Sequence, residues 1–287
     1  MTEAQAMDER AVERAAAERI AAFDGEAAFL AHNLATGAEI GYQAERVMPT
    51  ASTIKLLVLA ELYRQAEAGL VDLEARLTIA PEDRRGGSGI LKDLSPDVGL
   101  SARDHAVLMT ALSDNTSTAV LVRLLGRERL LASGRAWGMT ATDAMFTGPE
   151  RAYATSTPRD LVRLLTLIGS DALVSPAASA AIRDILVTQQ YHGQLARYLP
   201  FSQYNREGPA HRGPVIVRSK SGFMSSGVRV DAGLIDLPGG VRYAICTMTA
   251  GSKDNLYRPD HDGEILNGTL SRLVFDAWWP AGVPRID

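Results

Sequence analysis

The segment TASTIKLLVLAEL, residues 50–62, places one lysine at the head of an apolar run. The helical pattern extends from Ser52 to Ala68, and Gly69 supplies a C-terminal stop. Ser52 and Lys55 are three residues apart, so both lie on one face of the first helical turn. A lysine at this positive end of the helix dipole is unfavourable. The segment therefore predicts a lysine that either extends to solvent or is kept in the interior for chemistry.

Ser52 and Lys55 together have the chemistry of a nucleophile beside a base. Backbone N–H groups at a helix N-terminus stabilise negative charge on a serine oxygen. Burial and the positive helix end lower the pKa of a lysine, and a general base needs a pKa near 7 instead of about 10.4. The alternative is an ordinary N-cap serine followed by a lysine that extends to solvent. This motif alone does not decide between the two.

The composition is that of a globular protein with a large core. The chain has 287 residues, of which 46% are apolar and 22% charged. A formal net charge of −4 argues against nucleic acid or an anionic membrane as a partner. The single cysteine, Cys246, excludes an intrachain disulfide and lies in a strand-like apolar segment, where we expect it to be a buried core residue.

The N-terminal segment lacks the pattern of a secretory signal. Residues 1–23 mix acids and arginines with alanine, without a basic region followed by an apolar one. Elsewhere, no stretch reaches the roughly 18 apolar residues that a membrane helix needs. We therefore expect a soluble cytoplasmic protein with a small-molecule substrate and without a membrane partner. The oligomeric state is left open.

Strand patterns lie at both ends of the chain and helical patterns lie in the middle. Five segments have the residue pattern of strands: 27–34, 39–43, 214–222, 229–237 and 241–251. Residues 3–23 and 264–279 have helical patterns. We expect an α+β fold with an antiparallel sheet flanked by the terminal helices. The sheet domain would comprise residues 1–49 and 201–287, an all-helical domain of residues 50–200 would be inserted, and the active site would lie in the cleft between them.

Two helices inside the inserted region have clear starts. Ser101 as N-cap, with Asp104 in the first turn, predicts a helix over 101–112. Thr157 as N-cap and Pro158 at the first helical position begin another helix, for which we expect Gly169 to be the stop.

The SDN segment at 113–115 interrupts two helical patterns. Ser113 can relay a proton between a lysine and a leaving group, and Asn115 can hydrogen-bond a substrate amide. The alternative is that these residues cap the helix that follows.

The KSG segment at 220–222 follows the strand pattern VIVRS. Lys220 can lower the pKa of nearby groups and attract an anionic substrate, while Ser221 can hydrogen-bond a carboxylate. Gly222 allows a close approach of the backbone, so the N–H of Phe223 can face a developing oxyanion. The alternative is an ordinary exit from a strand into a turn.

The order of the three motifs is more informative than any one of them. The chain has one Ser-x-x-Lys motif, and two of its four lysines lie in these motifs. The order SxxK, SDN, KSG resembles that of the class A β-lactamase and penicillin-binding protein superfamily, the SxxK serine acyl-enzymes. Further segments resemble the family in the same order: GGSGIL at 86–91, TSTPRDLVRLL at 155–165, HGQLARYLP at 192–200 and MTAGSKD at 248–254. The resemblance covers about residues 25–280.

The resemblance implies a β-lactamase/DD-peptidase-like fold and a role for each motif residue. Ser52 would be acylated, Lys55 would be the base and Ser113 would relay the proton. Lys220 would supply a positive charge that sets the electrostatic potential at the site. The implied substrate-binding groups are Asn115, Ser221, Gly222, Arg229 for a carboxylate, and the N–H groups of Ser52 and Phe223 as the oxyanion hole.

The sequence departs from the family ahead of the 155–165 segment. Class A β-lactamases have a Glu-x-x-Leu-Asn motif there, whose glutamate activates the deacylating water, and residues 142–158 contain no such motif. Glu150 is the only glutamate in this segment. It is either a base for water or a solvated acid that pairs with Arg151.

We predict a serine hydrolase that forms an acyl-enzyme at Ser52 from a small amide, lactam or ester bearing a carboxylate. The five histidines form no His-x-His or His-Glu-x-x-His pair, so we expect neither a metal nor a cofactor. One alternative is a serine-dependent glutaminase, which would release ammonia. The other is a penicillin-binding or sensing domain that stays acylated.

Overall fold

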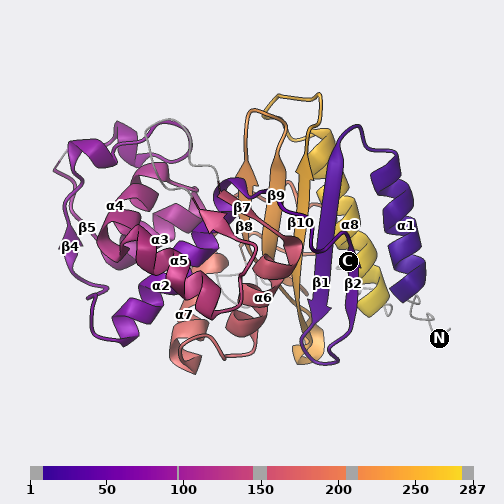
Figure 1. Ribbon diagram of the computed structural model, residues 1–287, viewed down its shortest axis with the longest axis horizontal. Coiled ribbons are helices and arrows are strands. Elements are labelled where there is room, and N and C mark those ends of the chain that lie inside the picture. The colour runs from indigo at the N-terminus through magenta and orange to yellow at the C-terminus, as the bar shows by residue number, and fades with distance from the viewer. Residues whose placement is uncertain (1–8, 96, 145–153, 205–212, 280–287) are drawn as a thin grey trace.

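A five-stranded antiparallel sheet runs through the protein (Figure 1). The computed structural model describes residues 9–95, 97–144, 154–204 and 213–279. The strand order is β2-β1-β10-β9-β8. The strands are β1 Glu26–Asn33, β2 Glu39–Tyr42, β8 Ile216–Phe223, β9 Arg229–Asp236 and β10 Arg242–Ala250. Each coincides with a predicted strand to within two residues, so the predicted antiparallel sheet is confirmed.

The two terminal helices cover one face of this sheet. They are α1 Glu9–Ala21 and α8 Asp262–Trp278. Val12 and Ile20 of α1 are buried with Leu270 of α8 against Phe29 and Ile245 of the sheet. The α+β fold with a sheet packed against the terminal helices is therefore as predicted.

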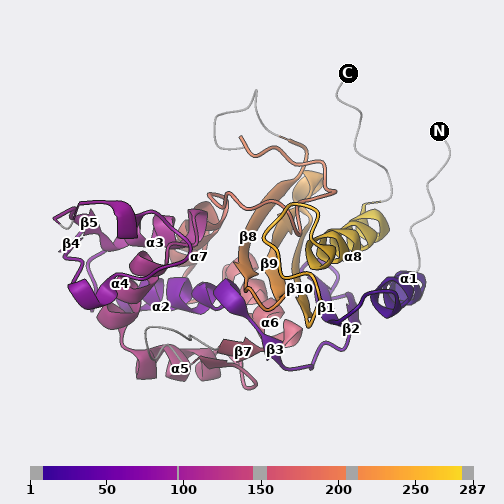
Figure 2. The same ribbon diagram turned by 90° about the horizontal axis from the view of Figure 1, so that it is seen from above.

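Helix α6, Pro158–Gly169, lies on the opposite face of the sheet (Figure 2). Leu161 and Leu165 share a core with Ala244 and Cys246 of β10. The sheet is thus buried on both faces, which explains why its strands read as nearly continuous apolar runs. Helix α6 packs on the sheet although it lies within residues 50–200, the predicted helical domain. The division into domains at residues 50 and 200 remains a prediction.

The remaining helices gather beyond β8, on the left of Figure 1. They are α2 Lys55–Glu67, α3 Ala102–Ala111, α4 Asn115–Leu125, α5 Arg127–Ala136 and α7 Pro176–Leu186. Helix α2 contacts the other four, and every residue from Lys55 to Tyr63 is buried. A helix surrounded in this way has no solvated face, and this accounts for the run LLVLA.

Short strands and turns complete the fold. β3 Met48–Pro49, β7 Ala154–Ser156 and β6 Asp143–Ala144 form a small sheet, and β4 Arg76–Leu77 pairs with β5 Leu100–Ser101. Four 3₁₀ turns are described: η1 Ala51–Ile54, η2 Pro81–Asp83, η3 Leu91–Asp93 and η5 Pro238–Gly240. Among the described residues, no helix is both long enough and apolar enough to cross a membrane.

Three details differ from the sequence analysis. The helix expected from Ser52 begins at Lys55, because η1 forms the preceding turn. Helices α5 and α7 had not been predicted. Gly169 is the last residue of α6 instead of a stop beyond it. A Cβ at Gly169 would lie 2.5 Å from Leu34 Cδ2 and 2.9 Å from Leu234 Cδ2, so this glycine allows α6 to pack closely on the sheet.

Thr157→Ala tests the N-cap that starts α6. The Thr157 hydroxyl oxygen accepts a hydrogen bond from Asp160 N at 3.1 Å. We expect a loss of about 1 kcal/mol in the free energy of unfolding, seen as a fall of about 2–4 °C in Tm by calorimetry. The matched control is Thr166→Ala in the same helix, where the hydroxyl donates to Val162 O and its loss should be nearly neutral. Equal effects of the two variants would contradict the assigned cap.

Candidate active site

The three sequence motifs meet at one place in the structure. Lys55, at the start of α2, contacts Ser113 and Asn115 at the break between α3 and α4. The end of β8 packs against the turn that carries Ser52. The fold therefore brings residues of all three motifs together from segments far apart in sequence.

Ser52 lies in the 3₁₀ turn η1 and is partly exposed. The turn is held by Thr50 N, which donates to Ala154 O at 2.9 Å, and by the Thr53 hydroxyl, which donates to Thr50 O at 2.7 Å. Ala51 has φ 45°, a left-handed conformation that is strained for a residue with a side chain. Thr50, and not Ser52, occupies the N-cap position of this turn. The ordinary N-cap interpretation of Ser52 is therefore excluded.

Lys55 is buried, with 5% of its surface exposed, so it does not extend to solvent. Its Nζ donates to Ser113 O at 2.7 Å, Asn115 Oδ1 at 2.8 Å and Ser113 Oγ at 3.1 Å. Burial lowers the pKa of Lys55 well below its usual value, and the charge of Lys220 lowers it further, while Asp114 acts in the opposite direction. The two lowering effects shift the protonation equilibrium of Lys55 toward the neutral amine.

Asp114 is the residue that caps α4. Its carboxylate accepts from Ser117 N at 2.8 Å, and also from Ile90 N at 2.7 Å and Leu91 N at 2.9 Å. Asp114 therefore holds the GGSGIL segment against the helix start. Because Asp114 supplies the side-chain cap, the capping alternative for the Ser113 side chain is excluded.

The conformation of the SDN segment directs two groups toward Lys55. Ser113 has φ 54°, in the left-handed region, and its carbonyl accepts from Lys55. The amide nitrogen of Asn115 donates to Gly86 O at 2.9 Å while its oxygen accepts from Lys55. The orientation of the Asn115 amide is thus fixed from both ends.

Lys220 on β8 is almost completely buried. Its Nζ donates to Ser221 O at 2.6 Å. Burial lowers the pKa of Lys220 to about 7, against the attraction of Asp231 on β9. Burial likewise raises the pKa of Asp231 to about 7. Lys220 and Asp231 therefore form an electrostatically linked buried pair beside the site.

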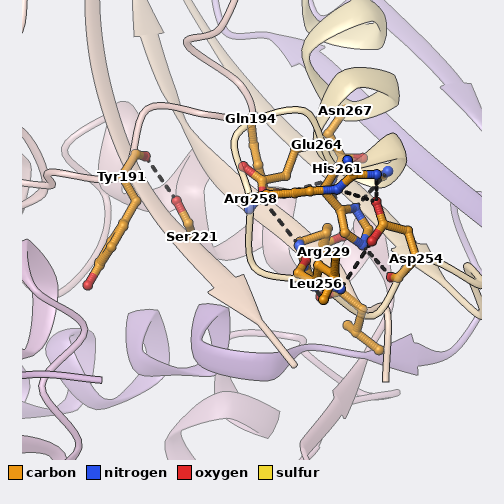
Figure 3. Close-up of polar contacts among 12 residues, drawn as sticks. Tyr191, Gln194, Ser221, Arg229, Asp254, Leu256, Arg258, His261, Glu264 and Asn267 are labelled. Carbon is orange, nitrogen blue, oxygen red and sulfur yellow. Dashed lines mark hydrogen bonds and ion pairs between the residues drawn. The ribbon is translucent and has the colours of Figure 1, made fainter. Parts of the chain in front are cut away.

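Ser221 makes two contacts at the edge of the sheet. Its hydroxyl donates to Tyr191 O at 3.2 Å, as Figure 3 shows, and its N–H donates to the side-chain oxygen of Gln189 at 3.1 Å. Gln189 also donates to the Ser219 hydroxyl at 2.9 Å. The segment around Gln189 thus occupies the edge of β8 that strand pairing leaves open.

Gly222 is where β8 approaches the Ser52 turn most closely. A Cβ at this position would lie 2.7 Å from Ser52 N, 2.8 Å from Thr50 O and 2.9 Å from Ala51 Cβ. Two of these atoms belong to the backbone and have no freedom to move aside. The close backbone approach expected at Gly222 is thus an approach to the turn that carries Ser52.

Phe223, the last residue of β8, pairs with Arg229, the first residue of β9. The Phe223 ring meets the ring of Tyr191 edge-on, with centroids 5.5 Å apart. Arg229 is 0% exposed and is paired with Glu264 of α8. A substrate carboxylate would reach this guanidinium only by displacing protein groups that already hold it.

Two residues of this site were absent from the sequence analysis, Gln189 and Asp231, and Asp114 appeared there only as a member of the SDN segment with a possible capping role. A signal for Asp231 existed, since it is an acid between Val230 and Ala232 inside a largely apolar strand, an anomaly of the kind that marks Lys55. Glu150 lies outside the described residues, so its role stays a prediction. No group of three or more metal-ligating side chains occurs within the described ranges.

Comparison with known proteins identifies the family. The model of the β-lactamase enzyme family matches residues 11–278. The chain belongs to this family. It is a β-lactamase-family serine hydrolase, and the resemblance read from the three motifs is confirmed. No curated protein matches the sequence at a significant level.

Solved structures of this family superpose on almost the whole enzyme. The β-lactamase from Sphaerobacter thermophilus DSM 20745 is 24% identical, with a TM-score of 0.84 over 97% of this chain and 100% of that chain. An ancestral class A β-lactamase is 24% identical, with a TM-score of 0.79 over 93% of this chain and 99% of that chain. A variant of PBP-A, solved as its acyl-enzyme complex with penicillin G, is 26% identical, with a TM-score of 0.79 over 94% of this chain and 95% of that chain.

Gly222→Ala tests whether β8 must lie this close to the nucleophile turn. The added methyl would push β8 and the Ser52 turn apart, and we expect acylation by a penicillin to slow about 10- to 100-fold. The measurement is the rate of adduct formation by intact mass. Gly233→Ala on β9 is the matched control, because the atoms nearest to its Cβ would be Ser219 Cβ at 2.5 Å and Arg218 O at 2.6 Å, and neither belongs to the Ser52 turn. Both variants should lose about 1–3 kcal/mol of stability. Equal rates of acylation in the two variants would contradict the assigned role of Gly222.

Proposed function

We propose that this β-lactamase-family enzyme transfers the acyl group of a small amide, lactam or ester to Ser52, with β-lactams among the donors. The observation that carries the proposal is the environment of Lys55. A buried amine with a lowered pKa lies one helical turn beyond Ser52, held by Ser113 and Asn115. Such an amine is suited to act as a general base.

The hydrogen bonds around Lys55 suit a neutral amine. A neutral amine has two N–H donors and one lone pair, and Ser113 O and Asn115 Oδ1 are two acceptors that lack a proton to give. The 3.1 Å contact in which Nζ donates to Ser113 Oγ would then reverse, with the Ser113 hydroxyl donating to the lone pair of the neutral amine. This arrangement would link Lys55 and Ser113 by one shared proton.

Acylation would proceed by attack of the Ser52 oxygen on the substrate carbonyl carbon. The Ser52 proton would pass to Lys55 Nζ, and the Ser113 hydroxyl would deliver a proton to the leaving nitrogen or oxygen as its bond to the carbonyl carbon breaks. Ser113 would regain its proton from Lys55. The N–H groups of Ser52 and Phe223 are the proposed donors to the oxyanion, and one such donor is typically worth about 2.7–4 kcal/mol.

A second candidate function is a protein that is acylated by penicillins and stays acylated. Residues 142–158 contain no Glu-x-x-Leu-Asn motif to activate a deacylating water. The similar PBP-A variant was captured as an acyl-enzyme with penicillin G. These two observations favour slow deacylation, and Glu150 remains the candidate base if turnover is fast.

Ser52→Ala and Lys55→Arg test the acylation step directly. We expect penicillin G to add its mass to the wild-type protein, no adduct with Ser52→Ala, and acylation slowed by about 10²- to 10⁴-fold with Lys55→Arg. Arginine keeps the positive charge but does not give up its proton. Intact-mass spectrometry over time provides both the adduct and its lifetime.

Each outcome of this experiment has one meaning. An adduct that survives Ser52→Ala, or a wild-type protein that no acyl donor labels, contradicts the nucleophile. Near-normal acylation of Lys55→Arg contradicts the base. A transient adduct supports a hydrolase with turnover, and a persistent one supports the penicillin-binding alternative.

Lys220→Gln tests the electrostatic link between the two lysines. The charge of Lys220 lowers the pKa of Lys55, so its removal should raise that pKa. Because the rate of acylation rises with pH as Lys55 loses its proton, the midpoint of this rise should move to higher pH. The measurement is the acylation rate constant against pH. The control is Lys253→Gln, whose side chain is 86% exposed and should leave the midpoint unchanged. An unmoved midpoint in Lys220→Gln contradicts the link.

A further inference from the structure

Arg229 is enclosed by the protein on every edge of its guanidinium. Its Nε donates to Glu264 Oε1 at 3.2 Å, and its Nη2 donates to Leu256 O at 2.6 Å. Its Nη1 donates to Met224 O at 3.0 Å and Val228 O at 2.9 Å. Four of the five N–H groups that an arginine carries are therefore in use. Figure 3 shows Arg229 between the loop that carries Leu256 and the start of α8.

Aromatic rings lie against the same guanidinium. Its carbon is 5.6 Å from the centre of the Phe223 ring and 5.1 Å from the centre of the Tyr257 ring. Arg229 is 0% exposed, whereas Tyr257 is 63% exposed. The ring of Tyr257 therefore lies on the solvent side and helps to close the site of the cation.

Recognition of a carboxylate by arginine normally uses two parallel N–H groups on one free edge. Here the Nε edge faces Glu264, and the two terminal nitrogens face backbone carbonyls. Glu264 is 6% exposed, and a methyl group at Gly193 would overlap its other carboxylate oxygen. The protein thus supplies its own carboxylate to Arg229 and closes the chain over it.

We propose that Arg229 is a positioning residue whose partner is Glu264, and that this enzyme selects acyl donors without holding a substrate carboxylate on Arg229. This inference rests on the proposed acylation of Ser52 and concerns how its donors are recognised. Any preference for a donor that carries a carboxylate beside the leaving group then comes from groups other than Arg229. The expectation that Arg229 holds a substrate carboxylate is replaced by a role inside the protein.

The role of Arg229 is to join three segments at the outer end of the site. Its bonds to Met224 O and Val228 O hold the turn between β8 and β9, directly after Phe223. Its bond to Leu256 O holds the loop between β10 and α8, and Glu264 connects it to α8. Arg229 acts on the reaction through the position of Phe223, whose N–H is a proposed donor to the oxyanion.

The test compares two acyl donors that differ in one carboxylate, phenyl phenylacetate and 3-carboxyphenyl phenylacetate. The measurement is kcat/KM for each ester in the wild type and in Arg229→Gln. We expect Arg229→Gln to lower both values by the same factor, whatever their ratio in the wild type. A loss of about 10- to 100-fold confined to the carboxylate ester would show a direct charge-assisted contact and overturn the proposal.

A double variant keeps the test valid if the single variant folds poorly. Arg229→Gln leaves Glu264 as an unpaired buried charge, which should lower Tm by roughly 10 °C. Arg229→Gln with Glu264→Gln removes both charges and should recover most of that loss. The ratio of the two kcat/KM values should again equal that of the wild type. A selective loss of the carboxylate ester in the double variant contradicts the proposal.

Limited proteolysis measures the positioning role without any acyl donor. Chymotrypsin should cut after Tyr257 faster in the single and double variants than in the wild type, because Leu256 O loses its partner. Equal rates of cleavage would refute the role of Arg229 in holding this loop. If neither the two esters nor penicillin G acylates the wild type, the proposed function fails, and the proteolysis still decides the role of Arg229.

Discussion

The burial of one amine, Lys55 Nζ, is the constraint on which the site depends. A buried amine needs polar partners, and residues 56–60, which follow Lys55 in α2, have apolar side chains that offer none. The partners come from the break between α3 and α4, where Ser113 O and Asn115 Oδ1 accept from Nζ. The burial of Lys55 therefore requires the break between α3 and α4. A continuous helix would use the Ser113 carbonyl for its own hydrogen bonds.

One further residue fixes each side of the site. Asp114 fixes the break between α3 and α4, and Gly222 fixes the position of β8. Asp114 gathers the N–H groups of Ile90, Leu91 and Ser117, so one carboxylate sets both the GGSGIL segment and the start of α4. On the sheet side, the missing side chain of Gly222 lets β8 reach the Ser52 turn. Close contact of these two sides also excludes water from Lys55, which is why burial dominates its lowered pKa.

Local signals in the sequence were enough to predict the strands of the sheet and the N-caps at Ser101 and Thr157, whereas the residues around Lys55 were predicted from the order of the three motifs and the resemblance to the family. The start of α7 has the same Ser-Pro type of signal at Ser175 and was overlooked, whereas α5, RERLLASGRA, has a weak apolar pattern. The pairing of Arg229 with Glu264 had no local signal. The two residues are 35 positions apart, and only the packing of α8 on β9 brings them together.

The contacts along β8 restrict how an acyl donor can meet the strand. The Ser221 N–H is used by Gln189, and the Ser221 hydroxyl is used by Tyr191 O. A donor would therefore meet β8 beyond Ser221, at Phe223, or would have to replace Tyr191 O as the partner of the Ser221 hydroxyl. Phe223 is also the residue that the Arg229 network positions and that the Tyr191 ring contacts. The rings of Phe223 and Tyr191 give this end of β8 an aromatic surface, on which a charged group would lose hydration without gaining an oppositely charged partner.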